Sequence, residues 1–171
     1  MFVHLNIHSV YSAMRGLLSL TDMIKIARSY SMNTLALTDV NGIWGFIRFV
    51  QHCNNSEIRP IAGVNLMTDT QEVVILVENQ YGYENLCRII SEVHDDQTKL
   101  ISDILKNYSS GLFVLSHDVS TLKALKHFIP DTHLFIELRP GMEESAIQQL
   151  AKDLKLEIVA TGDVYFKKKS D

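Results

Sequence analysis

The fold is decided by the stretch Phe2-Val3-His4-Leu5-Asn6-Ile7-His8, in which apolar and polar residues are interleaved. This pattern predicts a β-strand. Asn6 and His8 are two residues apart, so on an extended chain their side chains point to the same face. Two side chains placed in this way can bind one metal ion, but histidine is a good ligand for a transition metal and asparagine is a poor one. The strand is therefore expected to supply only half of such a pair.

The composition of the chain indicates one compact domain. Its 171 residues are 46% hydrophobic, and 8 Gly and 3 Pro leave little room for a long flexible linker. We therefore expect residues 1–171 to form a single domain with one core of ordinary size. A net charge of −4 argues against a domain that grips a phosphate backbone by charge. The basic run Lys167–Lys169 is interpreted as a solvated tail.

The chain shows no signal for export or membrane insertion. No apolar stretch approaches the roughly 20 residues of a membrane span, and the start lacks the charged and apolar regions of a signal peptide. Cys53 and Cys87 are far apart and are interpreted as buried free thiols. We expect a cytoplasmic protein without membrane contact.

Strand and helix patterns alternate along the chain, which predicts an α/β fold with a mainly parallel sheet. A short polar turn separates the strands predicted at residues 58–66 and 71–77, so these two strands can pair as a hairpin. After the opening stretch, strands are expected at residues 34–39, 58–66, 71–77, 111–116, 134–138 and 157–161, with helices between most of them.

Polar side chains recur where the predicted strands end. In a (β/α) barrel, the carboxyl ends of the strands carry the chemistry and the rest is packing. We therefore expect a site at this end of the sheet. We also expect an ion pair between Glu137 and Arg139, which lie at the end of the strand predicted at residues 134–138. The residues at these positions are Asn6, His8, Asp39, Asn65, His117, Asp118, Glu137, Arg139 and Asp163.

Five motifs occur in a fixed order: Val3–Ser12, Leu35–Asp39, Arg59–Gly63, Tyr81–Leu86 and Val159–Val164. Together they resemble the N-terminal PHP (polymerase and histidinol phosphatase) domain of bacterial DNA polymerase III alpha subunits, and the match runs nearly end to end. The resemblance implies a distorted seven-stranded (β/α) barrel that is similar to a TIM barrel. It also implies that these residues are the N-terminal domain of a longer polymerase.

The metal-binding motifs of that family are incomplete in this chain. Asn6, Val40 and Tyr165 stand where metal-binding members have histidines. Arg15 and Asn65 stand where they have acids. A site with two or three metal ions needs anionic and imidazole ligands around each cation, so these changes predict a degenerate site.

The resemblance leaves a vestigial pocket in which no catalytic residue is expected. Arg15 is predicted to pair with the surviving carboxylates in place of the lost cations. No cofactor is expected. If one ion of Mg, Mn or Zn remains, its ligands would be His8, Asp39 and Asp163. The pocket as a whole would comprise Asn6, His8, Arg15, Asp39, Asn65, His117, Asp118 and Asp163.

Three functions follow from the resemblance. The first is a structural or interaction domain of a replicative polymerase, whose partners are the rest of the alpha subunit and a proofreading exonuclease subunit, with DNA contacted through the parent polymerase. The second is a metal-dependent phosphoesterase, either a 3′–5′ exonuclease or a pyrophosphatase. The third is the same domain in an error-prone alpha-type polymerase. The first is our working hypothesis.

Overall fold

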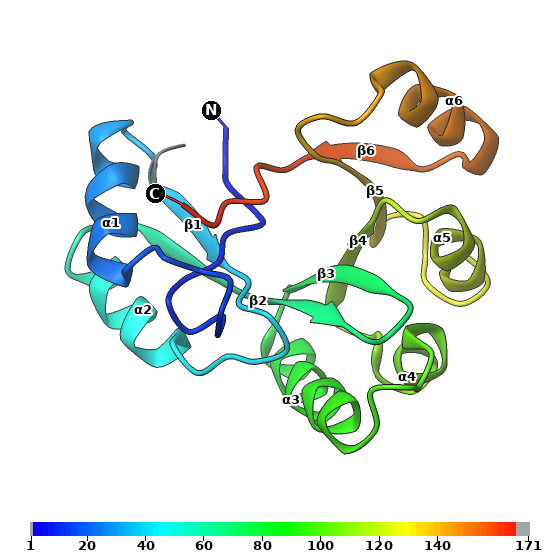
Figure 1. Cartoon of the computed structure of the whole chain (residues 1–171), viewed down its shortest axis with the longest axis horizontal. Helices are drawn as coiled ribbons and strands as arrows, with labels where there is room; N and C mark the ends of the chain where they lie inside the picture. The colour runs from blue at the N-terminus through cyan, green and yellow to red at the C-terminus, as the bar shows by residue number, and fades with distance from the viewer. Residues whose placement is uncertain (1, 167–171) are drawn as a thin grey trace.

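The computed structural model describes residues 2–166 and shows a curled sheet with helices around its outer face (Figure 1). The basic run Lys167–Lys169 lies outside the described residues. In chain order the elements are α1 (Leu20–Ser29), β1 (Thr34–Leu37), α2 (Phe46–Asn54), β2 (Arg59–Met67), β3 (Glu72–Val77), α3 (Gln80–Asp95), α4 (Ile101–Tyr108), β4 (Leu112–Ser116), α5 (Val119–Leu125), β5 (Leu134–Leu138), α6 (Glu144–Leu154) and β6 (Glu157–Ala160).

The strands lie in the sheet in the order in which they occur in the chain. The pairs β1–β2, β4–β5 and β5–β6 are parallel, whereas β3 runs antiparallel to both of its neighbours. The hairpin between β2 and β3 is therefore confirmed, and it pairs Met67 with Glu72. Because β3 is reversed, its first residue, Glu72, lies at the rim where the parallel strands end.

The structure differs from the expected seven-stranded barrel. In residues 2–166 the sheet has six strands and is curled into a half-barrel. The predicted strand at the start of the chain is wrong, because only Ile7 makes a β-bridge there, to Val164.

Buried polar side chains explain why the opening stretch is irregular. The hydroxyl of Thr38 accepts a hydrogen bond from the backbone N–H of Ile7 at 2.9 Å and lies 3.0 Å from the side-chain oxygen of Asn6. Such side-chain bonds compete with the regular ladder of a sheet. Two backbone bonds still join the stretch to β1 and its end, Ala36 N–H to His4 O at 3.1 Å and Thr38 N–H to Ile7 O at 2.9 Å.

The two ends of the described chain lie side by side (Figure 1). The N–H of His8 donates to Val164 O at 2.8 Å, and the N–H of Val164 donates to Asn6 O at 3.1 Å. A third bond joins Leu17 N–H to Tyr165 O at 3.1 Å. These contacts bring the segment after β6 to the polar residues near the start of the chain.

The core has an outer and an inner layer because successive strand residues face opposite sides. On β3, Val73 and Ile75 pack under α3, whereas Val74 and Leu76 face the inside of the curve. Cys53 is buried as expected, but Cys87 is only partly buried, because it lies beside the apolar stripe of α3. No helix within residues 2–166 is long and apolar enough to cross a membrane.

Thr38→Val should destabilise the protein by roughly 1–3 kcal/mol, because it removes the acceptor for the buried N–H of Ile7 without changing the side-chain shape. Denaturant unfolding measures this change. Thr34→Val on the same strand is the matched control, because the hydroxyl of Thr34 only contacts the exposed Asn33. Equal stability of the Thr38→Val variant and the unmodified chain would contradict this account of the opening stretch.

Candidate functional site

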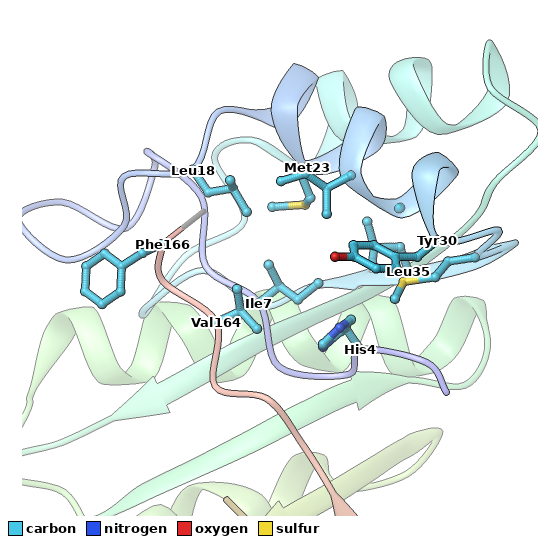
Figure 2. Close-up of a pocket in the computed structure, with 11 residues that line it drawn as sticks. His4, Ile7, Leu18, Met23, Tyr30, Leu35, Val164 and Phe166 are labelled. Atoms are coloured by element: carbon cyan, nitrogen blue, oxygen red, sulfur yellow. The ribbon is translucent and has the colours of Figure 1, made fainter. Parts of the chain in front are cut away.

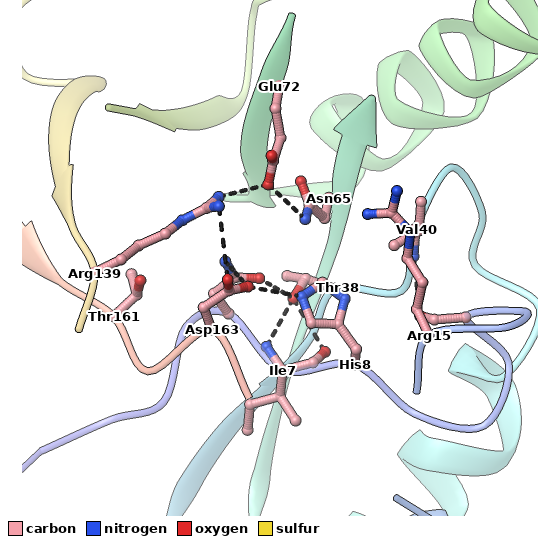
Figure 3. A network of polar contacts seen from close by, with 12 residues as sticks. Ile7, His8, Arg15, Thr38, Val40, Asn65, Glu72, Arg139, Thr161 and Asp163 are labelled. Carbon is pink, nitrogen blue, oxygen red and sulfur yellow. Dashed lines mark hydrogen bonds and ion pairs between the residues drawn. The ribbon is translucent and has the colours of Figure 1, made fainter. Parts of the chain in front are cut away.

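Four charged side chains meet at the rim where the parallel strands end, and we call them the rim cluster: Glu72, Glu137, Arg139 and Asp163. Figure 3 shows three of them, Glu72, Arg139 and Asp163. They come from the start of β3, from β5 and its end, and from the segment after β6. The side chain of Glu137 is 1% exposed and that of Arg139 is 12% exposed. The cluster is thus largely shielded from solvent.

The guanidinium of Arg139 contacts all three carboxylates of the rim cluster. Its Nη2 lies 2.7 Å from Glu72 Oε1, and its Nε donates to Glu137 Oε2 at 2.8 Å. Its Nη1 lies 3.6 Å from Asp163 Oδ2. Burial lowers the pKa of Arg139, but its bonds to Glu72 and the negative charges around it more than offset this effect, so the pKa is raised.

Glu137 is the most enclosed acid of the rim cluster. Its Oε1 accepts hydrogen bonds from Thr161 Oγ1 at 2.6 Å and from Asn6 Nδ2 at 3.0 Å. His117 Nδ1 lies 3.7 Å from Glu137 Oε2. Burial raises the pKa of Glu137. His117, the charge of Arg139 and the two hydrogen-bond donors together lower this pKa by more than burial raises it. Its net pKa lies below the usual value, so Glu137 is anionic at neutral pH.

Asp163 joins the rim cluster to the buried His8. The Nε2 of His8 lies 3.2 Å from Asp163 Oδ1, and Asn6 Nδ2 donates to the same oxygen at 3.2 Å. The ring of His8 stacks on Tyr165 with centroids 4.0 Å apart. Burial raises the pKa of Asp163, but His8 and Arg139 outweigh burial, so the pKa is lowered.

Asp39 serves the loop that follows the opening stretch. It accepts hydrogen bonds from the N–H of Ser9 at 2.7 Å, from the hydroxyl of Ser9 at 2.8 Å and from the hydroxyl of Ser12 at 2.6 Å. The loop returns so tightly that a Cβ at Gly16 would lie 1.9 Å from the carbonyl oxygen of Ser9. Asp39 therefore anchors this loop, and it makes no hydrogen bond to His8 or Asp163 in the described chain.

Two further predicted pocket residues have structural partners. Asn65 Nδ2 donates to Glu72 Oε1 at 3.0 Å, while the buried Oδ1 of Asn65 has no hydrogen-bond partner in residues 2–166. Asp118 caps α5, because its side chain accepts a bond from Thr121 N–H at 2.7 Å. Asn65 thus reaches the rim cluster and Asp118 does not.

Arg15 does not take the predicted role. Its Nη1 lies 3.0 Å from Met67 Sδ, and it forms no ion pair with any acid of the described residues. The expected ion pair between Glu137 and Arg139 is confirmed, and it is Arg139 that faces the carboxylates. Side-chain reach explains the difference, because Arg15 lies on an exposed loop and Arg139 directly follows the strand that carries Glu137.

Sequence reasoning missed Glu72 and Thr161 as members of the site. It considered only the carboxyl ends of strands, and Glu72 stands at the beginning of one. The signal was available in the predicted hairpin, because a reversed strand brings its first residue to that same rim. Thr161 follows β6 directly and donates to Glu137.

The donor set at the rim does not suit a divalent cation. The space between the three carboxylates holds the guanidinium of Arg139, whose charge repels a metal ion. No group of three His, Cys, Asp or Glu side chains in residues 2–166 is arranged to bind a metal. The buried Nδ1 atoms of His8 and His117 have no hydrogen-bond partner within residues 2–166. What this arrangement can do is hold three segments together by charge.

A separate cavity of about 340 Å³ lies between α1 and the paired terminal segments (Figure 2). Its walls are mainly apolar, with Met23, Leu35 and Val164 among them. His4 borders the cavity, and burial lowers its pKa. The lining contains no carboxylate, so this cavity is chemically distinct from the rim cluster.

The chain is similar to DNA polymerase III alpha subunits. It is 29% identical over 205 aligned positions to that of Buchnera aphidicola, covering 99% of this chain and 18% of the relative. It is 30% identical over 125 positions to that of Staphylococcus aureus strain Mu50, covering 70% of this chain and 12% of the relative. The chain thus spans less than a fifth of the length of these curated relatives.

A solved structure shares the fold. It is a Bifidobacterium adolescentis protein described as a metal-dependent phosphoesterase, with a TM-score of 0.65 and 13% identity, and the match covers 99% of this chain and 89% of that one. The model of the PHP domain family matches residues 4–166, nearly the whole chain. On this match, the chain belongs to the PHP domain family.

Proposed function

We propose that this chain is a single PHP domain at the N-terminus of a DNA polymerase III alpha subunit. The domain stabilises its parent polymerase and serves as an interaction surface, and it does not hydrolyse phosphate esters. The similarity to two alpha subunits supports the parent. DNA synthesis would then reside in the remainder of the polymerase.

The observation that carries the structural role is the position of Arg139. A metal-dependent phosphoesterase uses a divalent cation to activate water and to stabilise the developing negative charge. Here a fixed guanidinium lies 2.7 and 2.8 Å from two carboxylates at the rim. Arginine stays protonated and offers no open coordination position for water. The contacts of the rim cluster are therefore those of a structural network.

The residues that depart from the family's metal motifs support the same proposal. Asn6 donates to both Glu137 and Asp163, which occupies their oxygens. Tyr165 stacks on His8, so an aromatic contact replaces a second imidazole. A degenerate metal site whose ligands became hydrogen-bond and packing partners explains both contacts.

The partners proposed for this domain are the rest of the alpha subunit and a proofreading exonuclease subunit. DNA would be held by the parent polymerase, since the net charge of this chain is −4. A cytoplasmic location is part of the proposal. An error-prone alpha-type polymerase is the alternative parent.

The second candidate function is a metal-dependent phosphoesterase with a single Mg, Mn or Zn ion at His8, Asp39 and Asp163. The fold shared with the phosphoesterase of Bifidobacterium adolescentis favours it, as does the unpartnered buried Nδ1 of His8. Against it, Ser9 and Ser12 already donate to Asp39. We therefore rank it second.

The purified chain is expected to bind no Zn²⁺ or Mn²⁺ in stoichiometric amount and to hydrolyse neither single-stranded DNA nor pyrophosphate with Mn²⁺, Zn²⁺ or Co²⁺. Metal analysis after dialysis and product chromatography measure the two quantities. Hydrolysis that disappears in both His8→Ala and Asp163→Ala would establish the second candidate instead.

The stability of the domain should decrease at low pH because Glu137 and Asp163 become protonated. Both folded-state pKa values lie below the usual ones, so the stabilisation is complete above the unfolded-state pKa values of about 4 and is lost as the pH falls through the folded-state values. Urea unfolding between neutral pH and pH about 3 measures this loss of stability at low pH, which we call the acid limb.

Glu137→Gln should destabilise the protein by about 3–5 kcal/mol at neutral pH, because it leaves part of the buried charge of Arg139 unpaired, and should shrink the acid limb. Glu157→Gln, at an exposed position on β6, is the matched control. An unchanged acid limb in Glu137→Gln would refute the structural role of the rim cluster.

The docking role has its own test, in the full-length alpha subunit. Deleting this domain should abolish or weaken capture of the exonuclease subunit in a pull-down that uses the soluble fraction of the truncated polymerase. Equal capture with and without the domain would remove the exonuclease from the list of partners and leave the structural role standing.

A further inference from the structure

We infer that the inside of the half-barrel is a binding site for one fatty carboxylate, whose hydrocarbon tail fills an apolar cavity and whose head group pairs with Arg59. The site lies at the end of the sheet opposite the rim cluster. None of its residues belongs to that cluster, so the inference is independent of the proposed function.

A cavity of about 400 Å³ lies on the inner side of the curled sheet. Leu76 and Val77 at the end of β3 line it, whereas Glu72 at the start of β3 belongs to the rim cluster. The other walls come from the opening stretch and from β2, β4, β5 and β6. In the described chain the helices lie around the outer face (Figure 1), and none of them lines this cavity. The inner side of the sheet is thus left without a covering layer.

The apolar side chains at this cavity are less buried than their neighbours on the same strands. Val114 and Ile136 face the outer layer of the core and are 0% exposed. The adjacent Phe113 and Phe135 face the cavity and are only partly buried, as is Val159 on β6. Contact between apolar surface and water is unfavourable, so a ligand that replaces the water here is stabilised.

The chemistry of the walls selects an alkyl tail. Among the described residues that line the cavity, Arg59 and Glu78 are charged and all others have apolar side chains. A polar group deep in the cavity would lose its hydrogen bonds to water without gaining new ones. A hydrocarbon chain has no such group, and we therefore place the tail of the ligand in the cavity.

The charge of Arg59 selects the head group. Arg59 begins β2, is exposed, and its side chain makes no ion pair or hydrogen bond within residues 2–166. Glu78 already has partners, because its Oε1 lies 3.6 Å from His133 Nε2 and its Oε2 accepts a hydrogen bond from Asn79 Nδ2 at 3.2 Å. A guanidinium can bind a carboxylate through two parallel hydrogen bonds. The free charge at the cavity is therefore positive, and it fits a head group with one negative charge.

The experiment titrates the unmodified chain with decanoate, decanol and decylamine at neutral pH, each below its critical micelle concentration, in isothermal titration calorimetry. One decanoate should bind per chain, more tightly than decanol or decylamine, because decanoate alone can pair with Arg59. Simple partition onto an apolar surface would favour the uncharged decanol instead. The bound decanoate should also raise the Tm of the chain.

Arg59→Gln should weaken decanoate by about threefold to fivefold, the range of an exposed ion pair, and should leave decanol unchanged. Arg88→Gln is the matched control, because Arg88 is an exposed arginine on α3 that does not line the cavity. It should bind decanoate as the unmodified chain does. Both substitutions are at exposed positions, so both variants should fold.

A series of hexanoate, octanoate and decanoate tests the tail without any variant. Affinity should rise by up to about fourfold for each added CH₂ group that becomes buried. Val159→Phe fills part of the cavity and should weaken decanoate and decanol alike. If Val159→Phe does not fold, the chain-length series still decides whether the tail is buried.

Three results would overturn the inference: no binding of decanoate by the folded unmodified chain, equal affinity for decanoate in Arg59→Gln and Arg88→Gln, or an affinity that does not increase with the length of the tail. Tighter binding of decylamine than of decanoate would assign the charged contact to Glu78 and would overturn it as well. None of these results bears on the proposed function, which rests on the rim cluster.

Discussion

The contact of Arg139 with three carboxylates is the interaction on which this end of the domain depends. It joins β3, the end of β5 and the segment after β6 at one point. Burying these charges is costly, and the carboxylates are stabilised further by neutral hydrogen-bond donors. Thr161, Asn6 and Asn65 supply those donors. The amide and hydroxyl residues around the rim are therefore part of the same charge balance.

A second polar network sets the conformation of the opening stretch. Thr38 holds Ile7 and Asn6 through its hydroxyl, and Asp39 holds Ser9 and Ser12. These bonds draw the chain out of the regular ladder, so the barrel pattern ends in a half-barrel. The same bonds fix His8 beside Asp163. The irregular backbone and the geometry of the site thus have one origin.

The sequence predicted β1 to β6 because their apolar runs and turns are local signals. The opening stretch has an equally clear alternating pattern, and there the prediction failed, because periodicity does not register which buried polar groups will bind the backbone. At the site, the strand ends identified Asn6, His8, Asn65 and Asp163 as neighbours of the rim. The prediction that Arg15 pairs with the carboxylates was wrong. It rested on the position of Arg15 in a motif, whereas the contacts that an arginine can make depend on the direction in which its segment leaves the sheet.

The pairing of the two terminal segments has a consequence for how the chain reaches this structure. Asn6 bonds Asp163 across 157 positions of sequence, and Glu137 across 131. Contacts of such long range form late, because a long loop must close before they return any free energy. During synthesis, the opening stretch emerges first and lacks these partners until nearly the whole domain has been made. The rim cluster is therefore complete only after the segment that follows β6, with Asp163, has been made.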